Sequence, residues 1–291
     1  MHWEKRLVST DRGVFEVFQF GAGMPVCVAH NYSEFNHTGD AFAESFAQDH
    51  HVILVNLREA GNSAKAIEPY QLSMIEAVVD LEAIRTELGF DQWTFAGHST
   101  GGMIGLLYGI YFPRSLSSLI LAGTAAREYT SSSERCIYNV NHPQNALMNK
   151  LMALLKSPTL TETDRKSLAQ QRTQLSLYHP EKYADYFSAG IQKKMSAIRL
   201  DFFNRELSIY DITRQLEKIT APALILCGRH DVQCPVDFSI EMSEYIPNNK
   251  LVIFEDSNHY PFLEEAELFK EVTRHFLEES LLTGSINLEG R

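Results

Sequence analysis

Residues 93–112 place the strongest constraint on how this 291-residue chain can fold. A short apolar run at 93–96 leads into Gly97-His98-Ser99-Thr100-Gly101, and apolar residues at helical spacing follow it. This order predicts a strand, a sharp turn and a helix. A turn this tight strains the backbone at its centre, and a side chain at position 97 or 101 would press on neighbouring backbone. The sequence therefore favours a serine presented on a strand-to-helix turn.

Ser99 stands at the centre of a Gly-x-Ser-x-Gly pattern, which is the sequence form of a nucleophile elbow. The helix that follows would point N–H groups and its positive dipole end at negative charge forming beside the serine Oγ. The pattern alone is a weak signal. Its weight here comes from the strand expected before it, the helix expected after it, and the residues found downstream.

Strand and helix patterns alternate around this turn. An alternating run at 14–20 predicts a strand near a sheet edge, and continuous apolar runs predict buried strands at 26–29, 51–55 and 116–122. Helical patterns lie between them at 39–47 and 73–88, with Ser73 as the N-cap of the second. This order predicts an α/β fold with a doubly wound, mostly parallel sheet, whose ligands gather at the carboxyl ends of the strands.

The strand pattern stops at 127–218, where four helices are expected at roughly 133–156, 161–176, 180–195 and 200–217. A long helical insertion after a sheet strand is typical of a lid, although a separate helical domain with its own core would give the same pattern. The sheet pattern resumes at 222–228 and 250–254, with helices at 237–245 and 261–279. We therefore expect a core of residues 1–126 and 219–279, a helical cap at 127–218 and a frayed tail at 280–291.

A serine nucleophile needs a general base held by a third group. Both partners are expected at the carboxyl ends of sheet strands, and the sequence offers one candidate of each type there. Asp231 lies three residues past the strand ending at Gly228, and His259 lies five past the strand ending at Phe254. The chain order serine, aspartate, histidine is that of α/β-hydrolases. We therefore expect Ser99, Asp231 and His259 to act as a catalytic triad.

Competing assignments are weaker. His230 adjoins Asp231, but adjacent loop residues usually point apart, and Asp256 lies only three residues before the expected base, where a solvated loop charge is the simpler interpretation. His98 is expected to pack beside the serine, and His30 to be a structural histidine beside the pocket.

An acyl-transfer site also needs hydrogen-bond donors aimed at the oxygen that becomes negative. The Thr100 N–H, at the start of the expected helix, is one candidate. The second donor should come from the loop after the strand that ends at Ala29, and the Tyr32 N–H is the candidate there.

These segments resemble the α/β-hydrolase superfamily, in the form of a capped serine hydrolase, over essentially the whole chain. The resemblance rests on Gly97-His-Ser-Thr-Gly101, the polar loop at 56–63, Gly228-Arg-His-Asp231 and Ser257-Asn-His259. The Gly-Arg-x-Asp-x-x-Cys-Pro form at 228–235 is similar to proline iminopeptidases. The superfamily usually has His-Gly after the strand that precedes the oxyanion loop, whereas this chain has His30-Asn31. Asparagine tolerates a positive φ better than most residues, so the loop is expected to keep its shape.

The composition limits the kinds of binding partner and the location that we expect for this protein. The chain has 26 Lys and Arg against 37 Asp and Glu, a formal net charge of −11 without a long basic run, so neither nucleic acid nor a membrane surface is an expected partner. The start lacks an apolar signal segment, and no run of residues approaches the length of a membrane span. The four cysteines are scattered, and three adjoin apolar strands, where buried thiols are expected. A cytoplasmic protein is the simplest interpretation, and the composition is compatible with a homo-oligomer.

No bound cofactor is expected. No cluster of His, Asp and Glu has metal-ligand spacing, and no Gly-x-Gly-x-x-Gly follows the first strand.

Three functions fit these residues. The leading hypothesis is a serine hydrolase that cleaves a carboxylic ester or lactone of a small molecule with an apolar part, which an aromatic lid would select. An aminopeptidase of the iminopeptidase type would need acidic lid residues to bind the substrate amine, for which the sequence offers Glu134, Glu162, Glu181 and Asp185. A ligand-binding protein without catalysis on the same fold is the third.

Overall fold

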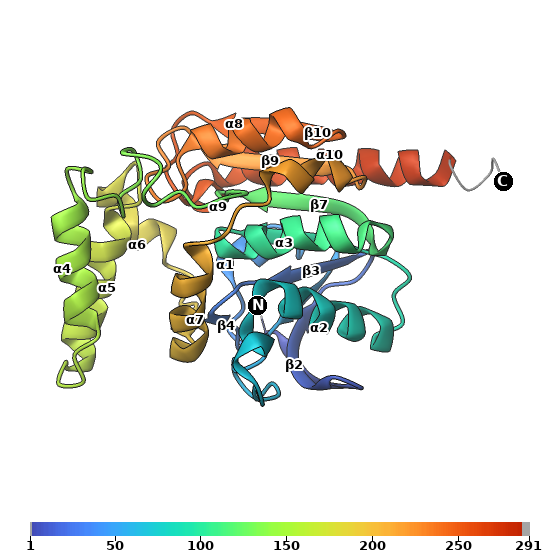
Figure 1. Ribbon diagram of the computed structural model, residues 1–291, viewed down its shortest axis with the longest axis horizontal. Helices are drawn as coiled ribbons and strands as arrows, with labels where there is room; N and C mark the ends of the chain where they lie inside the picture. The colour runs from blue at the N-terminus through green and yellow to red at the C-terminus, as the bar shows by residue number, and fades with distance from the viewer. Residues whose placement is uncertain (1, 287–291) are drawn as a thin grey trace.

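The apolar runs form one eight-stranded sheet. The computed structural model describes residues 2–286 (Figure 1). The spatial order of this sheet is β1 (Glu4–Thr10), β2 (Gly13–Phe20), β5 (His51–Val55), β3 (Pro25–Ala29), β6 (Trp93–His98), β7 (Leu116–Ala122), β9 (Ala223–Gly228) and β10 (Asn249–Phe254). Within this sheet the pairs β1–β2 and β2–β5 are antiparallel and the other pairs are parallel, as the sequence predicts for a mostly parallel sheet.

The edge strand β1 is not among the strands expected from the sequence. It pairs along its full length with β2, with Val8 opposite Phe15. Of its seven residues only Val8 is buried, so the strand has no apolar run or clear alternation that would distinguish it from a loop.

Helices cover both faces of the sheet (Figure 1). On one face lie α2 (Met74–Glu87), α3 (Thr100–Tyr111) and α8 (Val236–Tyr245), and the other is covered by α1 (Ala41–Glu44), α9 (Pro261–Glu264) and α10 (Ala266–Ile286). Ser73 caps α2 as expected, since its hydroxyl accepts from the Glu76 N–H at 3.3 Å. No helix within residues 2–286 is long and apolar enough to cross a bilayer.

The C-terminal helix is longer than expected. The sequence predicts its end at 279, whereas α10 continues to Ile286. Part of the expected tail at 280–291 is therefore helical, and residues 287–291 lie outside the described part of the chain.

The cap segment, defined as residues 127–218, leaves the sheet after β7 and returns before β9. Its elements are α4 (Asn145–Leu155), α5 (Glu162–Gln174), α6 (Tyr183–Tyr186), a two-residue strand β8 (Lys194–Met195) and α7 (Ala197–Leu207). These helices are shorter than the expected ones. At the first of them, residues 131–143 form successive turns rather than the start of α4. In Figure 1, α4 and α5 stand together beyond one end of the sheet, and α7 lies between them and the sheet.

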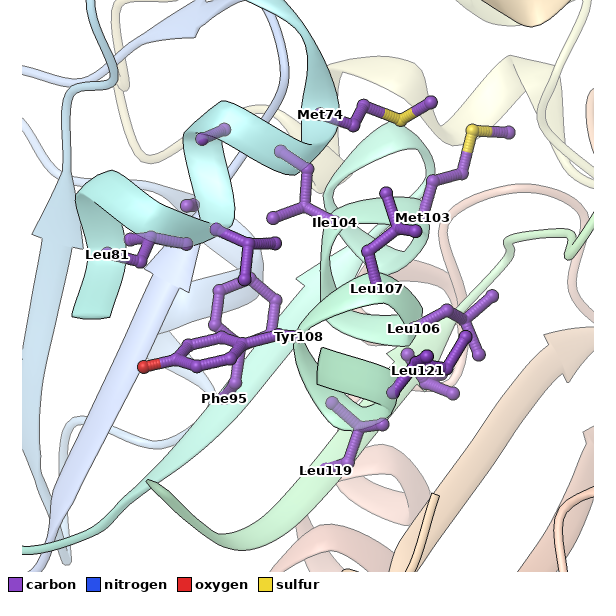
Figure 2. Packing of buried hydrophobic residues seen from close by; sticks show 14 of the residues in the cluster. Met74, Leu81, Phe95, Met103, Ile104, Leu106, Leu107, Tyr108, Leu119 and Leu121 are labelled. Carbon is purple, nitrogen blue, oxygen red and sulfur yellow. The ribbon is translucent and has the colours of Figure 1, made fainter. Parts of the chain in front are cut away.

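Helix α3 is the centre of the larger core cluster (Figure 2). Nearly all of its residues are buried, and it packs against β6, β7 and α2. Ile104 of α3 lies between α3 and α2, on the side of Met74, while Phe95 of β6 packs against the ring of Tyr108. The helix that carries Ser99 at its start is thus fixed by apolar contacts on several sides.

Truncation of Ile104 tests this packing. Ile104 is 0% exposed, and we expect Ile104→Ala to lower the free energy of unfolding by about 2–5 kcal/mol, because the lost methyl groups leave a cavity. Ile75 on α2 is 36% exposed, and Ile75→Ala should change the free energy of unfolding by less than about 1 kcal/mol. Urea unfolding measures both variants, and equal losses would contradict this account of the core.

Candidate active site

Ser99 lies on a strained turn between β6 and α3. Its φ is 55° and its ψ is −123°, a conformation that costs a non-glycine residue about 1–3 kcal/mol. The Ser99 N–H donates to the Ala122 carbonyl at the end of β7 at 2.8 Å, which fixes the turn against the next strand.

The two glycines of the turn have the expected steric reason. A Cβ on Gly97 would lie 2.3 Å from the Gly101 carbonyl group, and a Cβ on Gly101 would lie 2.3 Å from the Ala29 carbonyl oxygen. Real Cβ atoms do not approach backbone this closely, so any larger residue would force the strand and the helix apart.

Asp231 and His259 meet at the ends of the parallel strands β9 and β10. The two carboxylate oxygens of Asp231 lie 2.9 and 3.1 Å from His259 Nδ1. One of these oxygens also accepts the N–H groups of Gln233 at 2.8 Å and Cys234 at 2.9 Å, so the carboxylate is fixed in orientation. Asp231 is 4% exposed and His259 is 2% exposed. The hydrogen bonds between the carboxylate and Nδ1 orient the imidazole.

A close backbone contact joins the loops that carry this pair. A Cβ on Gly228 would lie 2.0 Å from the Asn258 carbonyl oxygen, so only glycine lets the two loops approach. Across the same contact, the His230 N–H donates to the Ser257 carbonyl at 3.0 Å, and the Val232 N–H to Asn258 Oδ1 at 3.0 Å.

The Asp231–His259 pair lies beside the Ser99 turn. His98, the residue before Ser99, has its Nε2 2.8 Å from the His259 carbonyl oxygen, and the two imidazole rings are 4.6 Å apart. A Cβ on Gly123, which follows the carbonyl that binds the Ser99 N–H, would lie 3.3 Å from His259 Nδ1. Among the residues described, the Ser99 hydroxyl makes no hydrogen bond, and bonds between a nucleophile and its base are often long before substrate binds.

The competing residues lie elsewhere. Asp256 is exposed and does not contact His259, while its N–H donates to Glu265 at 3.1 Å. The His230 ring stacks on Tyr178 of the cap segment at 4.4 Å. All four cysteines are buried free thiols. Within residues 2–286, no group of three or more His, Cys, Asp or Glu side chains could hold a metal ion.

The two expected oxyanion donors lie in different environments. The Thr100 N–H is in the first turn of α3, where a helix has no internal acceptor. The Tyr32 N–H, in contrast, donates to His30 Nδ1 at 3.3 Å, and the Ser33 N–H donates to the same nitrogen at 3.2 Å. His30 Nε2 lies 3.2 Å from Thr100 Oγ1. His30 therefore holds the loop after β3 against the start of α3.

Asn31 corrects one expectation. The sequence suggests that asparagine replaces a glycine here because it tolerates a positive φ, but among the described non-glycine residues only Glu59 and Ser99 have one. The Asn31 side chain has a different partner, because its Oδ1 accepts from Nη2 of Arg199 at 2.8 Å. No sequence signal points to Arg199, which lies far along the chain on a helix with an amphipathic pattern.

Aromatic rings continue from His259 into the cap segment. The Tyr260 ring lies 5.2 Å from His259 and 6.0 Å from Phe187, which stacks on Tyr183 at 4.7 Å. The cap segment also contacts the histidine loop through its backbone, since the His259 N–H donates to the Ser176 carbonyl at 3.3 Å.

The sequence matches the family described as alpha/beta hydrolase fold over residues 25–266. The chain belongs to the α/β-hydrolase family. A solved structure of an alpha/beta fold family hydrolase from Bacillus anthracis str. Sterne is 37% identical, with a TM-score of 0.91, over 96% of this chain and 100% of that one. An esterase from Exiguobacterium antarcticum is 24% identical, with a TM-score of 0.70, over 94% of this chain and 100% of that one, and shares the fold.

Curated relatives of this α/β-hydrolase include proline iminopeptidases. The one from Clostridioides difficile (strain 630) is 29% identical over 271 residues, which are 85% of each chain. The one from Heyndrickxia coagulans is 25% identical over 282 residues, covering 93% of this chain and 96% of that protein.

The lowered pKa of His30 should make the stability of the protein depend on pH. Burial of its ring, helped by the charge of Lys193, lowers the pKa of His30 from its ordinary 6.5 to about 3. Below pH 6.5 the unfolded chain therefore takes up a proton that the folded state does not, so stability falls as the pH decreases towards 3.

The variant His30→Asn removes this titration while keeping an acceptor near the Nδ1 position. Between pH 7 and pH 5 we expect it to lose less unfolding free energy than the unaltered protein, by on the order of 1–2 kcal/mol. Urea unfolding at the two pH values measures the difference. The exposed His37, changed to Asn, serves as the control and should leave the pH dependence as it is. Identical pH dependence in the unaltered protein and His30→Asn would refute a neutral His30.

Proposed function

We propose that this α/β-hydrolase is a serine hydrolase that cleaves a carboxylic ester or lactone through an acyl-enzyme intermediate. Ser99 is assigned as nucleophile, His259 as general base and Asp231 as the group that orients the imidazole. The observation that carries the proposal is the strained Ser99 turn next to a buried Asp231–His259 pair joined at 2.9 Å. A strained serine beside such a pair is the arrangement that acyl transfer needs.

In this mechanism, His259 Nε2 takes the proton from the Ser99 hydroxyl as Oγ attacks the ester carbonyl carbon. The tetrahedral intermediate collapses, the alcohol leaves with the proton from His259, and an acyl-enzyme is formed. Water then attacks the acyl group with His259 again as base, which releases the acid and regenerates the hydroxyl. Asp231 accepts from Nδ1 throughout, so Nε2 is the nitrogen free to act.

The Thr100 N–H and the positive end of the α3 dipole are the proposed main stabilisers of the oxyanion. The Tyr32 N–H is the proposed second donor. Because it has a long hydrogen bond of 3.3 Å to His30 Nδ1, it would share its hydrogen between the ring nitrogen and the oxyanion.

The charges around the site support an ester in preference to a free amine. Burial is the main cause that lowers the pKa of His30 and His98, and the charge of Lys193, whose ammonium group lies 3.6 Å from Asp40, contributes at both, with Arg199 adding to it at His30. A substrate ammonium group would meet like charge there.

The acidic residues considered for amine binding are all exposed, and three of them have partners of their own: Glu134 with Asn141, Glu162 with Lys166 and Glu181 with His179.

The iminopeptidase function is the second candidate, and it is favoured by the curated relatives of that name. It uses the same three residues and differs in what the pocket binds. A non-catalytic ligand-binding role is the third, and it offers no reason for the strain at Ser99.

Replacement of the proposed nucleophile is the direct test. We expect the protein to react with a fluorophosphonate probe at Ser99, mapped by mass spectrometry, and Ser99→Ala to remove labelling and lower ester turnover by at least about 1000-fold. The unfolding free energy should not decrease, because the substitution removes only a hydroxyl. The exposed Ser208, changed to Ala, is the control and should keep full activity. Labelling at another residue, or turnover above a few per cent in Ser99→Ala, would remove the assignment.

A substrate comparison separates the two enzymatic candidates. With 4-nitrophenyl butyrate and proline 4-nitroanilide under the same conditions, we expect kcat/KM for the ester to be higher by at least about 100-fold, since the ammonium group of proline meets the site cations. N-acetyl-proline 4-nitroanilide, which lacks the ammonium group, should be cleaved no more slowly than proline 4-nitroanilide. Preferential cleavage of the free-amine anilide would establish the iminopeptidase function, and binding without turnover of either compound would favour the non-catalytic role.

A further inference from the structure

Arg199 is a buried cation that is not in a direct ion pair. It lies on α7 of the cap segment and is 1% exposed, and the carboxylates whose charge acts on it, Asp80, Glu206 and Glu59, form no ion pair with it. Burial lowers the pKa of Arg199 to about 10, so the guanidinium keeps its charge at neutral pH.

All of its acceptors are uncharged oxygens. Nε donates to the Asn31 carbonyl, and Nη2 donates to Asn31 Oδ1 at 2.8 Å. Nη1 donates to the Arg58 carbonyl at 2.9 Å, and Nη2 also reaches the Leu72 carbonyl at 3.4 Å. One side chain of the cap segment thus joins three separate segments of the core, and it binds Asn31 through both backbone and side chain.

The chain next to Arg199 extends the contact along the same loop. Strand β8 pairs with β4 (Ser33–Glu34), with Ser33 opposite Met195 and Glu34 opposite Lys194. The Ser196 N–H donates to the Tyr32 carbonyl at 2.8 Å. Every residue from 31 to 34 is therefore bound to the segment 194–199, which we call the exit segment of the cap.

The free-energy cost of burying its charge indicates that Arg199 has a role beyond packing. Burial of a cation is costly, and apolar residues of similar volume commonly replace buried charges with no loss of stability. The gain from the guanidinium is geometric, because its rigid planar donors fix several carbonyl groups at once. The residue it binds most completely lies between His30 and Tyr32, in the loop proposed to supply an oxyanion donor.

We propose that Arg199 is a positioning residue that holds the 30–34 loop in the conformation required for transition-state stabilisation, so that the exit segment of the cap is part of the catalytic apparatus. The inference rests on the proposed serine hydrolase function. Arg199 contacts no reacting atom in this role, and it acts through the backbone of Asn31 and Tyr32.

The test uses Arg199→Met in the full chain with 4-nitrophenyl butyrate as substrate. We expect kcat to fall by about 10- to 100-fold with KM changed by less than about threefold, because the loss affects the transition state more than substrate binding. Arg199→Lys, which can restore only part of the donor set, should have an intermediate kcat. The matched control is Arg205→Met on the same helix, where the arginine is exposed, and its kcat should equal that of the unaltered protein.

Asn31→Ala keeps the proposal testable if Arg199→Met does not fold. It removes one acceptor of the guanidinium and should lower kcat by about 10-fold, and the double variant should be no worse than Arg199→Met alone because both act through one contact. A folded Arg199→Met with kcat within twofold of the unaltered protein would overturn the proposal. Unchanged kcat in Asn31→Ala, when Arg199→Met does not fold, would overturn it as well.

Hydrogen exchange separates this inference from the proposed function. In Arg199→Met, amides of residues 32–35 and 194–196 should exchange faster than in the unaltered protein and in Arg205→Met, whether or not the protein cleaves esters. Unchanged exchange there would overturn the positioning role. Failure of the unaltered protein to react with the fluorophosphonate would instead overturn the assignment of Ser99, and faster exchange in Arg199→Met would still support the contact with the loop.

Discussion

The backbone contact across Gly97 and Gly101 is the constraint on which the site depends. It lets α3 start directly beneath the end of β6, and it leaves Ser99 with a φ of 55°. Such a conformation persists only where the surroundings determine it. Here β6 pairs with β3 on one side and with β7 on the other, and the pairing with β7 continues to His98 opposite Ala122. The strained conformation of Ser99 is thus maintained by the central strands of the sheet, and it does not depend on the sequences of the surrounding loops.

The sequence predicts this part of the molecule well for a physical reason. Buried parallel strands must be continuous apolar runs, and the polar residues that follow them must gather at one edge, so Asp231 and His259 could be assigned from spacing to the positions where they meet. Strand β1 has no such signature, because it lies at the edge of the sheet with one buried residue. The start of the first cap helix also differs from the prediction, since the turns at 131–143 contain residues compatible with a helix.

Asn31 shows where inference from local sequence ends. An asparagine in place of a glycine suggests a backbone explanation, yet the described chain has no positive φ at this position. The explanation is a guanidinium 168 residues away in sequence. Arg199 occupies a helix whose pattern would place an arginine towards water, and burial of its charge becomes tolerable only when three separate segments present their carbonyl oxygens together. Such a site exists only in the folded protein.

The cap segment contacts both parts of the proposed catalytic machinery. On one side, the Ser176 carbonyl accepts from the His259 N–H at 3.3 Å, and the Ser176 hydroxyl accepts from Gln233 Nε2 at 3.0 Å, next to the aspartate loop. On the other side, the exit segment binds the 30–34 loop. A rearrangement of the cap that breaks either set of hydrogen bonds would therefore alter the general base or the oxyanion loop. In this α/β-hydrolase, the cap segment is therefore joined to the loops of the proposed triad and oxyanion site through both main-chain and side-chain hydrogen bonds.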